Sequence, residues 1–199
     1  INSAIAQASG QAATGSIGLG FAIPANQARR TAEEIGRSFP GIRVITSGAG
    51  EVHESVGSEP AIVVATPGAE PVAAGGYAAV LLLDAWASLD RPDLRAAEEA
   101  VRRWVAAAGL ARSWSDGGVV VLCGAPSHVT IPAVEALVRW DPEWFAAREL
   151  AERAELSLPP TTWTAEVVAD RKRVEPIEHA VRAAATQAQL LGPLPVTGS

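Results

Sequence analysis

The stretch "AIVVATPGAEPVAAGGYAAVLLLD", residues 61–84, contains two apolar runs separated by a loop rich in glycine, proline and alanine. Short apolar runs bounded by turn residues indicate buried strands. We therefore expect strands over 61–66 and 79–84. Uniformly apolar strands of this kind are buried on both faces and are typical of a parallel sheet between layers of helices.

The sequence on either side of this stretch continues the alternation of strands and helices. Further strands are expected over 42–46 and 118–123, and helices over 26–39, 92–111, 131–139 and 141–156. The helix from 92 to 111 has one apolar face, and Pro92 stands in its first turn, where the missing N–H costs nothing. The predicted fold class is α/β, a parallel sheet with flanking helices.

The two ends of the chain predict smaller pieces. Residues 1–24 contain apolar runs at 1–6 and 17–23 and are expected to form a β-hairpin. After the doublet Pro159-Pro160, a strand over 163–169 and a helix over 176–188 predict the start of a small α+β unit. The predicted domains are 1–27, 28–157 and 158–199.

Composition narrows the classes of function. The formal net charge of −6 and the pI near 5.1 disfavour nonspecific coating of DNA, which depends on cationic side chains. Cys123 is the single cysteine, so an internal disulfide and a thiolate-cluster zinc site are excluded. No long uncharged apolar stretch and no signal peptide are visible, so we expect a cytoplasmic protein without a membrane partner. Because the chain lacks methionine, we expect a fragment or a fusion.

The loop between the two runs could cradle a phosphate if its backbone N–H groups were free. The loop contains neither lysine nor arginine, and no G-x-x-x-x-G-K-[ST] motif occurs in the chain. We therefore interpret Thr66, Gly68 and Gly75-Gly76 as turn residues at strand ends.

Other chemistry-bearing residues give weaker patterns. The group Ser113, Ser115, Asp116 and His128 is close in sequence but lacks a G-x-S-x-G elbow, so a serine hydrolase is disfavoured. His53 is expected to be a solvated loop histidine rather than a metal ligand. Six tryptophans could stack on nucleobases, but core packing is the favoured interpretation for most of them.

Several segments carry a resemblance to a known family. They include "ARRTAEEIGRSFPGIRVITSG" from residue 28, the stretch quoted first, "RWDPEWFAARELAERAELSLPP" and "LLGPLPV". Residues 28–199 resemble the C-terminal part of primosomal protein N-prime, the bacterial replication-restart helicase, in its actinobacterial form. This resemblance implies a second RecA-like helicase lobe from 28 to about 140 and the start of a C-terminal DNA-binding domain from 158. The implied partners are forked or single-stranded DNA and primosome or replication proteins.

The resemblance also implies a nucleotide site. The loop after residue 66 corresponds to helicase motif V, where Thr66 keeps the strand end and Pro71-Val72 stands near the lysine-glycine pair of relatives. The motif that supplies arginines to the ATP γ-phosphate falls on "AAAGLARS", residues 106–113. There Gly109 is retained, but Leu110 and Ser113 occupy the arginine positions and Arg112 is one step off. An arginine finger places charge where the transition state accumulates it, which leucine cannot do. The implied site, formed by Thr66, Gly68, Gly109 and Arg112, is degenerate.

No catalytic residue, metal or cofactor is expected in the chain, although ATP is possible in the family. The first lobe and the zinc region of relatives have no counterpart in this sequence. Arg95, Arg102 and Arg103 are the candidate DNA contacts. The pairs Glu98 to Arg102 and Glu99 to Arg103 offer the alternative that these arginines only stabilise their helix.

Residues 1–30 carry a different resemblance. "INSAIA" and "GSIGLGFAIPANQARR" resemble the last strands of an HtrA-type trypsin-like serine protease domain. The catalytic serine of that family precedes these strands, so the resemblance assigns no catalytic residue here.

These patterns together predict a non-catalytic, helicase-like fragment that contributes to DNA-fork binding and primosome assembly. One alternative is an ATP-dependent helicase lobe completed by a separate first lobe. The other is a fragment of an HtrA-type protease fusion.

Overall fold

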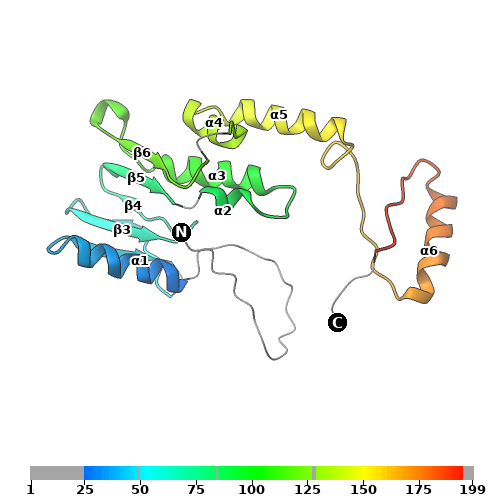
Figure 1. The fold of residues 1–199 in the computed structure, drawn as a ribbon, viewed down its shortest axis with the longest axis horizontal. Helices are drawn as coiled ribbons and strands as arrows, with labels where there is room; N and C mark the ends of the chain where they lie inside the picture. Colours follow the sequence, from blue (N-terminus) through cyan, green and yellow to red (C-terminus); the bar gives the residue numbers. More distant parts are fainter. Residues whose placement is uncertain (1–24, 49, 84, 127–128, 195–199) are drawn as a thin grey trace. The chain divides into compact units, whose positions relative to one another are not determined.

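The computed structural model describes residues 25–48, 50–83, 85–126 and 129–194 (Figure 1). The chain divides into two compact units, one ending at Arg148 and the other beginning at Glu149. The predicted hairpin over 1–24 lies outside the described residues. The domain boundaries at 27/28 and 157/158 remain predictions.

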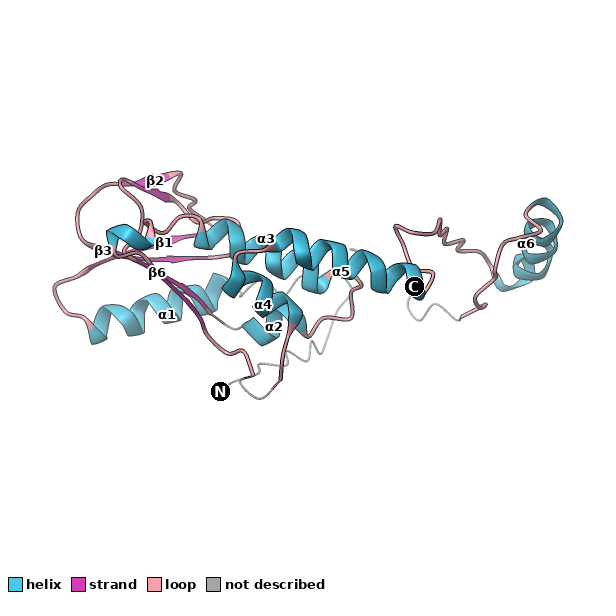
Figure 2. Cartoon of the chain, turned by 90° about the horizontal axis from the view of Figure 1, so that it is seen from above, coloured by secondary structure: helices cyan, strands magenta, loops and turns pink. Residues whose placement is uncertain are grey.

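The structure contains both helices and strands, which Figure 2 distinguishes by colour. In chain order the elements are α1 (Ala25–Ser38), β1 (Arg43–Ser47), β2 (Ser55–Val56), β3 (Ala61–Ala65), β4 (Val72–Ala73), β5 (Ala79–Leu82), α2 (Ala85–Leu89), α3 (Ala96–Ala108), the 3-10 turn η1 (Trp114–Asp116), β6 (Val119–Leu122), α4 (Pro132–Arg139) and α5 (Pro142–Glu155). The helix α6 (Arg171–Ala184) follows in the second unit. The fold is therefore α/β, as predicted.

The four predicted strands are confirmed as β1, β3, β5 and β6. β1 pairs in parallel with β3, with Arg43 opposite Ala61, and β5 pairs in parallel with β6, with Ala79 opposite Val119. The short strands β2 and β4 form a third parallel pair. The sequence analysis missed β2 and β4 because two residues are too few to show an alternating pattern.

The expectation that the apolar strands are buried on both faces is wrong for β5 and β6. Leu81 is 59% exposed and Val119 51% exposed, whereas Leu82 is buried. Neighbouring side chains of a strand point to opposite faces. Since α3 packs against β5, the face of β5 that carries Leu82 is covered, whereas Val119, Val120 and Val121 of β6 are all exposed in the part of the chain that the structure describes.

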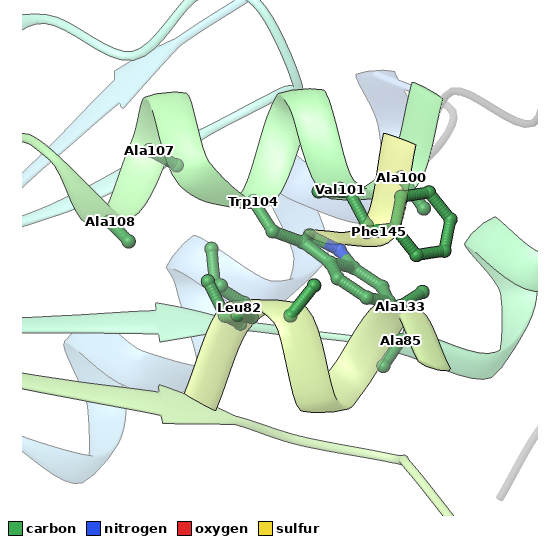
Figure 3. Close-up of a cluster of buried hydrophobic side chains, with 11 residues drawn as sticks. Leu82, Ala85, Ala100, Val101, Trp104, Ala107, Ala108, Ala133 and Phe145 are labelled. Carbon is green, nitrogen blue, oxygen red and sulfur yellow. The ribbon is translucent and has the colours of Figure 1, made fainter. Parts of the chain in front are cut away.

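The hydrophobic core lies between α3 and its neighbours (Figure 3). Trp104 is 4% exposed and lies among Leu82, Ala85 and Ala133. Alanines at the contact positions of α2, α3 and α4 let the helices approach closely around Trp104, and the ring of Phe145 joins the same cluster. The apolar face predicted for this part of the chain is thus the face that forms the core.

The helix expected over 92–111 exists as α3, but it starts at Ala96 and ends at Ala108. The short α2, which was not expected, precedes it. The Asp93 carboxylate accepts a hydrogen bond from the N–H of Arg95 at 2.8 Å, and its carbonyl accepts one from Ala96 at 3.0 Å. These bonds close a turn ahead of the helix, so Pro92 precedes α3 instead of standing in its first turn.

The strand expected over 163–169 in the second unit is also wrong, because these residues adopt no regular structure. Val167 and Val168 are exposed, and a strand without a neighbour to pair with is not stable. The helix predicted over 176–188 exists but runs over 171–184 as α6, which continues through Pro176.

The interpretation of most tryptophans as core residues is wrong as well. Only Trp104 is buried and Trp144 is partly buried, whereas Trp86, Trp114, Trp140 and Trp163 are exposed. Composition does not report which face of an element a ring occupies.

Within the described residues, no helix is both long enough and apolar enough to span a bilayer.

Candidate functional site

The loop from Thr66 to Tyr77, which includes β4, connects β3 to β5, and most of its backbone N–H groups donate hydrogen bonds to other groups of the protein. The donors are Thr66 to Ser47, Gly68 to the Glu70 carboxylate, Ala69 to Thr66, Val72 to Glu54, Ala74 to Val56, Gly76 to Ala73 and Tyr77 to Leu110. A phosphate cradle needs several free N–H groups that converge on the anion. Hydrogen bonds therefore hold this loop in place as a connection between strands, in agreement with the interpretation of Thr66, Gly68 and Gly75-Gly76 as turn residues.

Ser47, at the end of β1, fixes the first half of the loop. Its hydroxyl donates to the carbonyl of Ala69 at 2.6 Å and accepts from the N–H of His53 at 3.0 Å. The residue is 2% exposed. One buried hydroxyl thus joins three segments of the chain.

The backbone N–H of Gly68 already has a negatively charged acceptor within the loop. Its φ of +89° favours glycine, and its N–H donates to Oε2 of Glu70 at 2.9 Å. The carboxylate occupies the place where a bound anion would accept this hydrogen bond. Its charge also repels phosphate.

The second half of the loop meets the segment after α3. The N–H of Tyr77 donates to Leu110, and the N–H of Arg112 donates to Tyr77, both at 2.9 Å. Nε of Arg112 donates to the carbonyls of Gly76 at 3.1 Å and of Gly75 at 3.3 Å. Gly76 has a φ of +74°, and a Cβ there would lie 3.1 Å from the backbone nitrogen of Arg112. The structure brings two distant predicted segments together, with Arg112 bound to backbone carbonyls.

Gly109, Leu110 and Ser113 complete the comparison with the predicted nucleotide site. Gly109 ends α3, and its N–H donates to the carbonyl of Val105 at 2.9 Å. Leu110 accepts from Tyr77, while the Ser113 hydroxyl contacts that of Ser115 at 2.8 Å. Each of these residues has a local structural role.

A pocket of about 320 Å³ opens at the carboxyl ends of β1 and β3. It is lined by Ala28, Arg29, Thr46, Ser47, Gly48, Gly50, Glu51, Val64 and Thr66. The carboxyl ends of parallel strands are a common place for ligands. The pocket offers hydroxyl groups, one guanidinium and one carboxylate, which suits a polar ligand.

Of the predicted nucleotide-binding residues, Thr66 alone lines this pocket. Sequence reasoning missed Arg29, Ser47 and Gly48. A Cβ on Gly48 would lie 2.7 Å from Oγ1 of Thr66, so glycine is needed where the two strand ends meet. The run Thr46-Ser47-Gly48 at the end of a predicted strand was the available signal.

The candidate DNA contacts differ in their partners. Nε of Arg102 donates to Oε2 of Glu99 at 2.7 Å, and Nε of Arg103 donates to Oε1 of Glu99 at 2.6 Å. The hydrogen bond from Arg102 is the main cause that lowers the pKa of Glu99 to about 2, and the Arg103 guanidinium adds to it. The predicted partner of Arg102 was Glu98, whereas the structure pairs it with Glu99.

Arg95 lies just before α3 and is exposed. The structure shows no ion pair of its side chain with any residue that it describes. Among the described residues, its guanidinium is therefore the one of the three predicted DNA contacts that is not shared with a carboxylate.

The remaining candidate chemistry has no assembled site in the described part of the chain. No group of three or more His, Cys, Asp or Glu side chains there could hold a metal ion. Nε2 of His53 lies 3.7 Å from the Glu51 carboxylate. His128 lies outside the described residues.

Comparison with known proteins gives clear relatives. The chain is 52% identical over 167 residues to a protein of Mycobacterium leprae named "Probable replication restart protein PriA", a match of 84% of this chain and 25% of the relative. It is 50% identical over 170 residues to proteins with the same name from Mycobacterium tuberculosis and Mycobacterium bovis, a match of 84% of this chain and 26% of each relative. The chain thus spans about a quarter of the length of these relatives. No protein-family profile and no solved structure matches it.

Proposed function

Because most of this chain is homologous to part of the replication restart protein PriA, we propose that it serves replication restart as a non-catalytic, helicase-like piece. In this role it contacts forked DNA and contributes to assembly of the primosome. The match covers 25% of the relative, so this role describes one portion of such a protein.

The hydrogen bonds of Arg112 are the observation that carries the non-catalytic part of the proposal. A guanidinium stabilises a transferring phosphoryl group only when it points at that group. Arg112 instead donates from Nε to two loop carbonyls. Leu110 and Ser113 bring no cation to the positions that the resemblance assigns to arginines.

Titration calorimetry with ATP and magnesium tests this part. We expect no binding heat at millimolar nucleotide. The alternative of an ATP-dependent lobe completed by a separate first lobe predicts measurable heat from the chain itself. Detection of such heat, with loss of it in Arg112→Ala, would contradict our proposal.

Arg95 supports the DNA part of the proposal. Phosphate contacts depend on cations that can displace counterions, and Arg95 is exposed with no ion pair among the described residues. Arg102 and Arg103 share the carboxylate of Glu99, so we assign them smaller contributions.

Fluorescence anisotropy with a labelled DNA fork tests this assignment. Arg95→Ala should weaken binding several-fold and reduce the slope of log K against log salt by about 1. Arg37→Ala, an exposed arginine of α1, is the matched control and should leave both quantities unchanged. Equal affinity of the Arg95→Ala variant and the unmodified chain would remove Arg95 from the interface.

A further inference from the structure

The second unit carries the densest run of positive charge in the chain. Arg171, Lys172 and Arg173 are consecutive, and nowhere else in the sequence do three basic residues follow one another. All three residues of this basic run are exposed. Their side chains form no ion pair with any described residue, whereas Arg182 of the same helix pairs with Glu178 at 3.3 Å.

The stability of α6 does not explain the basic run. The run occupies the first turn of the helix, where the partial positive charge of the helix dipole favours acidic side chains. That turn contains no acidic residue, and neighbouring cations also repel one another. Three unpaired cations at this position therefore lower the stability of the helix, which indicates a role outside it.

The charge around the basic run allows an anion to approach. Within residues 158–199, four acidic residues balance four basic ones, so the formal charge of −6 arises entirely before residue 158. The eight residues are Glu166, Asp170, Glu175 and Glu178 against Arg171, Lys172, Arg173 and Arg182. The repulsion of phosphate that the net charge predicts for the whole chain is thus weaker in this segment.

Trp163 adds an aromatic surface to the same unit. Its side chain is 103% exposed, and residues 163–170 adopt no regular structure. A fully exposed indole contributes nothing to a core, but its face can stack on a nucleobase. The bases of a duplex already stack on one another, so single-stranded DNA is the form that offers them.

The spacing of Trp163 and the basic run suits one strand. Arg171 follows Trp163 by eight residues, and eight residues of extended chain span at most about 28 Å. One strand of B-DNA carries a phosphate about every 3.4 Å along its axis. A strand of about ten nucleotides is therefore long enough to contact both features.

We propose that Trp163 and the basic run of Arg171, Lys172 and Arg173 form a binding site for single-stranded DNA in the second unit. The cations contact backbone phosphates, and the indole stacks on a base. This inference rests on the proposed role in replication restart and adds a contact to the one that Arg95 makes from the first unit.

Fluorescence anisotropy of the full chain with a labelled oligothymidylate of about 12 nucleotides tests the stacking contact. Trp163→Leu keeps an apolar side chain but removes the ring, and it should weaken binding about tenfold. Trp163→Phe keeps an aromatic face and should retain most of the affinity. Trp114→Leu, at a position 89% exposed in the first unit, is the matched control and should bind as the unmodified chain does.

The salt dependence of the same binding tests the cations. Replacement of Arg171, Lys172 and Arg173 together by alanine should reduce the slope of log K against log salt by about 2, because each phosphate contact of a single strand contributes about 0.7. Joint replacement of Arg30, Arg37 and Arg43, which are exposed arginines of the first unit, removes the same charge and should leave the slope unchanged.

Three outcomes would overturn this site. They are no binding of the oligothymidylate, equal affinities of Trp163→Leu and Trp163→Phe, and equal affinities of the chain for the single strand and for a duplex of the same length. The last outcome would assign the basic run to polyanions in general. The effect of Arg95→Ala on the labelled fork is measured separately, so its persistence beside any of these outcomes would contradict this site and leave the proposed function intact.

Discussion

Ser47 has a larger structural role in the site than any residue predicted from the sequence. Its hydroxyl bonds both the Ala69 carbonyl and the His53 N–H, and the residue is buried and lines the polar pocket. Removal of a buried hydroxyl with two hydrogen-bond partners lowers stability most when no water can take its place beside those partners. Ser47 therefore positions the start of the loop and the strand end that faces it.

We expect Ser47→Ala to lower the free energy of unfolding by about 1–3 kcal/mol, because two partly buried backbone groups lose their partner. Urea denaturation measures the change. Ser58→Ala, at an exposed loop position, should change the stability by less than about 0.5 kcal/mol. Equal midpoints for the two variants would show that the Ser47 bonds are replaced by water.

Glu99 gives a pH-dependent prediction. The hydrogen bond from Arg102, with the one from Arg103, lowers the pKa of Glu99 from the ordinary value of 4.5 to about 2 in the folded chain. A lowered carboxyl pKa stabilises the fold above the unfolded value, and this stabilisation is lost as the pH falls from 4.5 towards 2. We expect Glu99→Gln to be less stable than the unmodified chain at pH 7, by less than about 1 kcal/mol because the pair is largely exposed.

The difference between Glu99→Gln and the unmodified chain should shrink when urea denaturation is repeated at decreasing pH below 4.5. Glu33→Gln, on the exposed face of α1, serves as the control. A difference that stays constant down to pH 2 would contradict the ion-pair origin of the lowered pKa.

At the scale of elements, α3 organises the first unit. It packs against α2, α4 and β5, and its buried face carries Trp104. The periodic apolar positions of α3 were visible in the sequence. The start of α3 was not, because the turn closed by Asp93 depends on a side-chain hydrogen bond that competes with helix continuation.

Trp104→Ala tests how much this hydrophobic core contributes to the free energy of unfolding. Removal of a buried indole costs about 3–5 kcal/mol, a large share of the stability of a small domain. Thermal and urea unfolding should shift strongly. Trp114→Ala, at a position 89% exposed, is the matched control and should shift neither. A small effect of Trp104→Ala would mean that α2 and α4 collapse into the vacated space.

At the scale of the whole molecule, the two units differ in how they are stabilised. All the buried hydrophobic residues among those described lie before Glu149, while the second unit buries Arg153. Nη1 of Arg153 donates to the Pro159 carbonyl at 3.1 Å, and Oγ1 of Thr161 donates to the Arg153 carbonyl at 3.2 Å. Hydrogen bonds without an apolar core give little cooperativity.

A peptide of residues 158–199 should therefore show low helix content. α6 has 14 residues, contains Pro176 and buries none of them, and isolated helices of this length are marginal. Circular dichroism with temperature should give a gradual change. A cooperative transition of the peptide would contradict this prediction and indicate an independent domain.

The sequence alone determined the elements whose signal is local. β1, β3, β5 and β6 follow from apolar runs bounded by turn residues, and α4 and α5 lie where helices were expected over 131–139 and 141–156. The family resemblance was also readable from the sequence, because the matching residues are contiguous along the chain.

Only the tertiary structure decided which distant groups meet. Three sets of contacts join segments far apart in sequence. They are the hydrogen bonds of Arg112 to Gly75 and Gly76, the close approach of Gly48 to Thr66, and the two hydrogen bonds of the Ser47 hydroxyl. The exposure of Trp114 and the coil at 163–169 depend equally on which neighbours are present. Local patterns encode backbone preference, whereas burial and hydrogen-bond partners arise only when chain segments pack together in space.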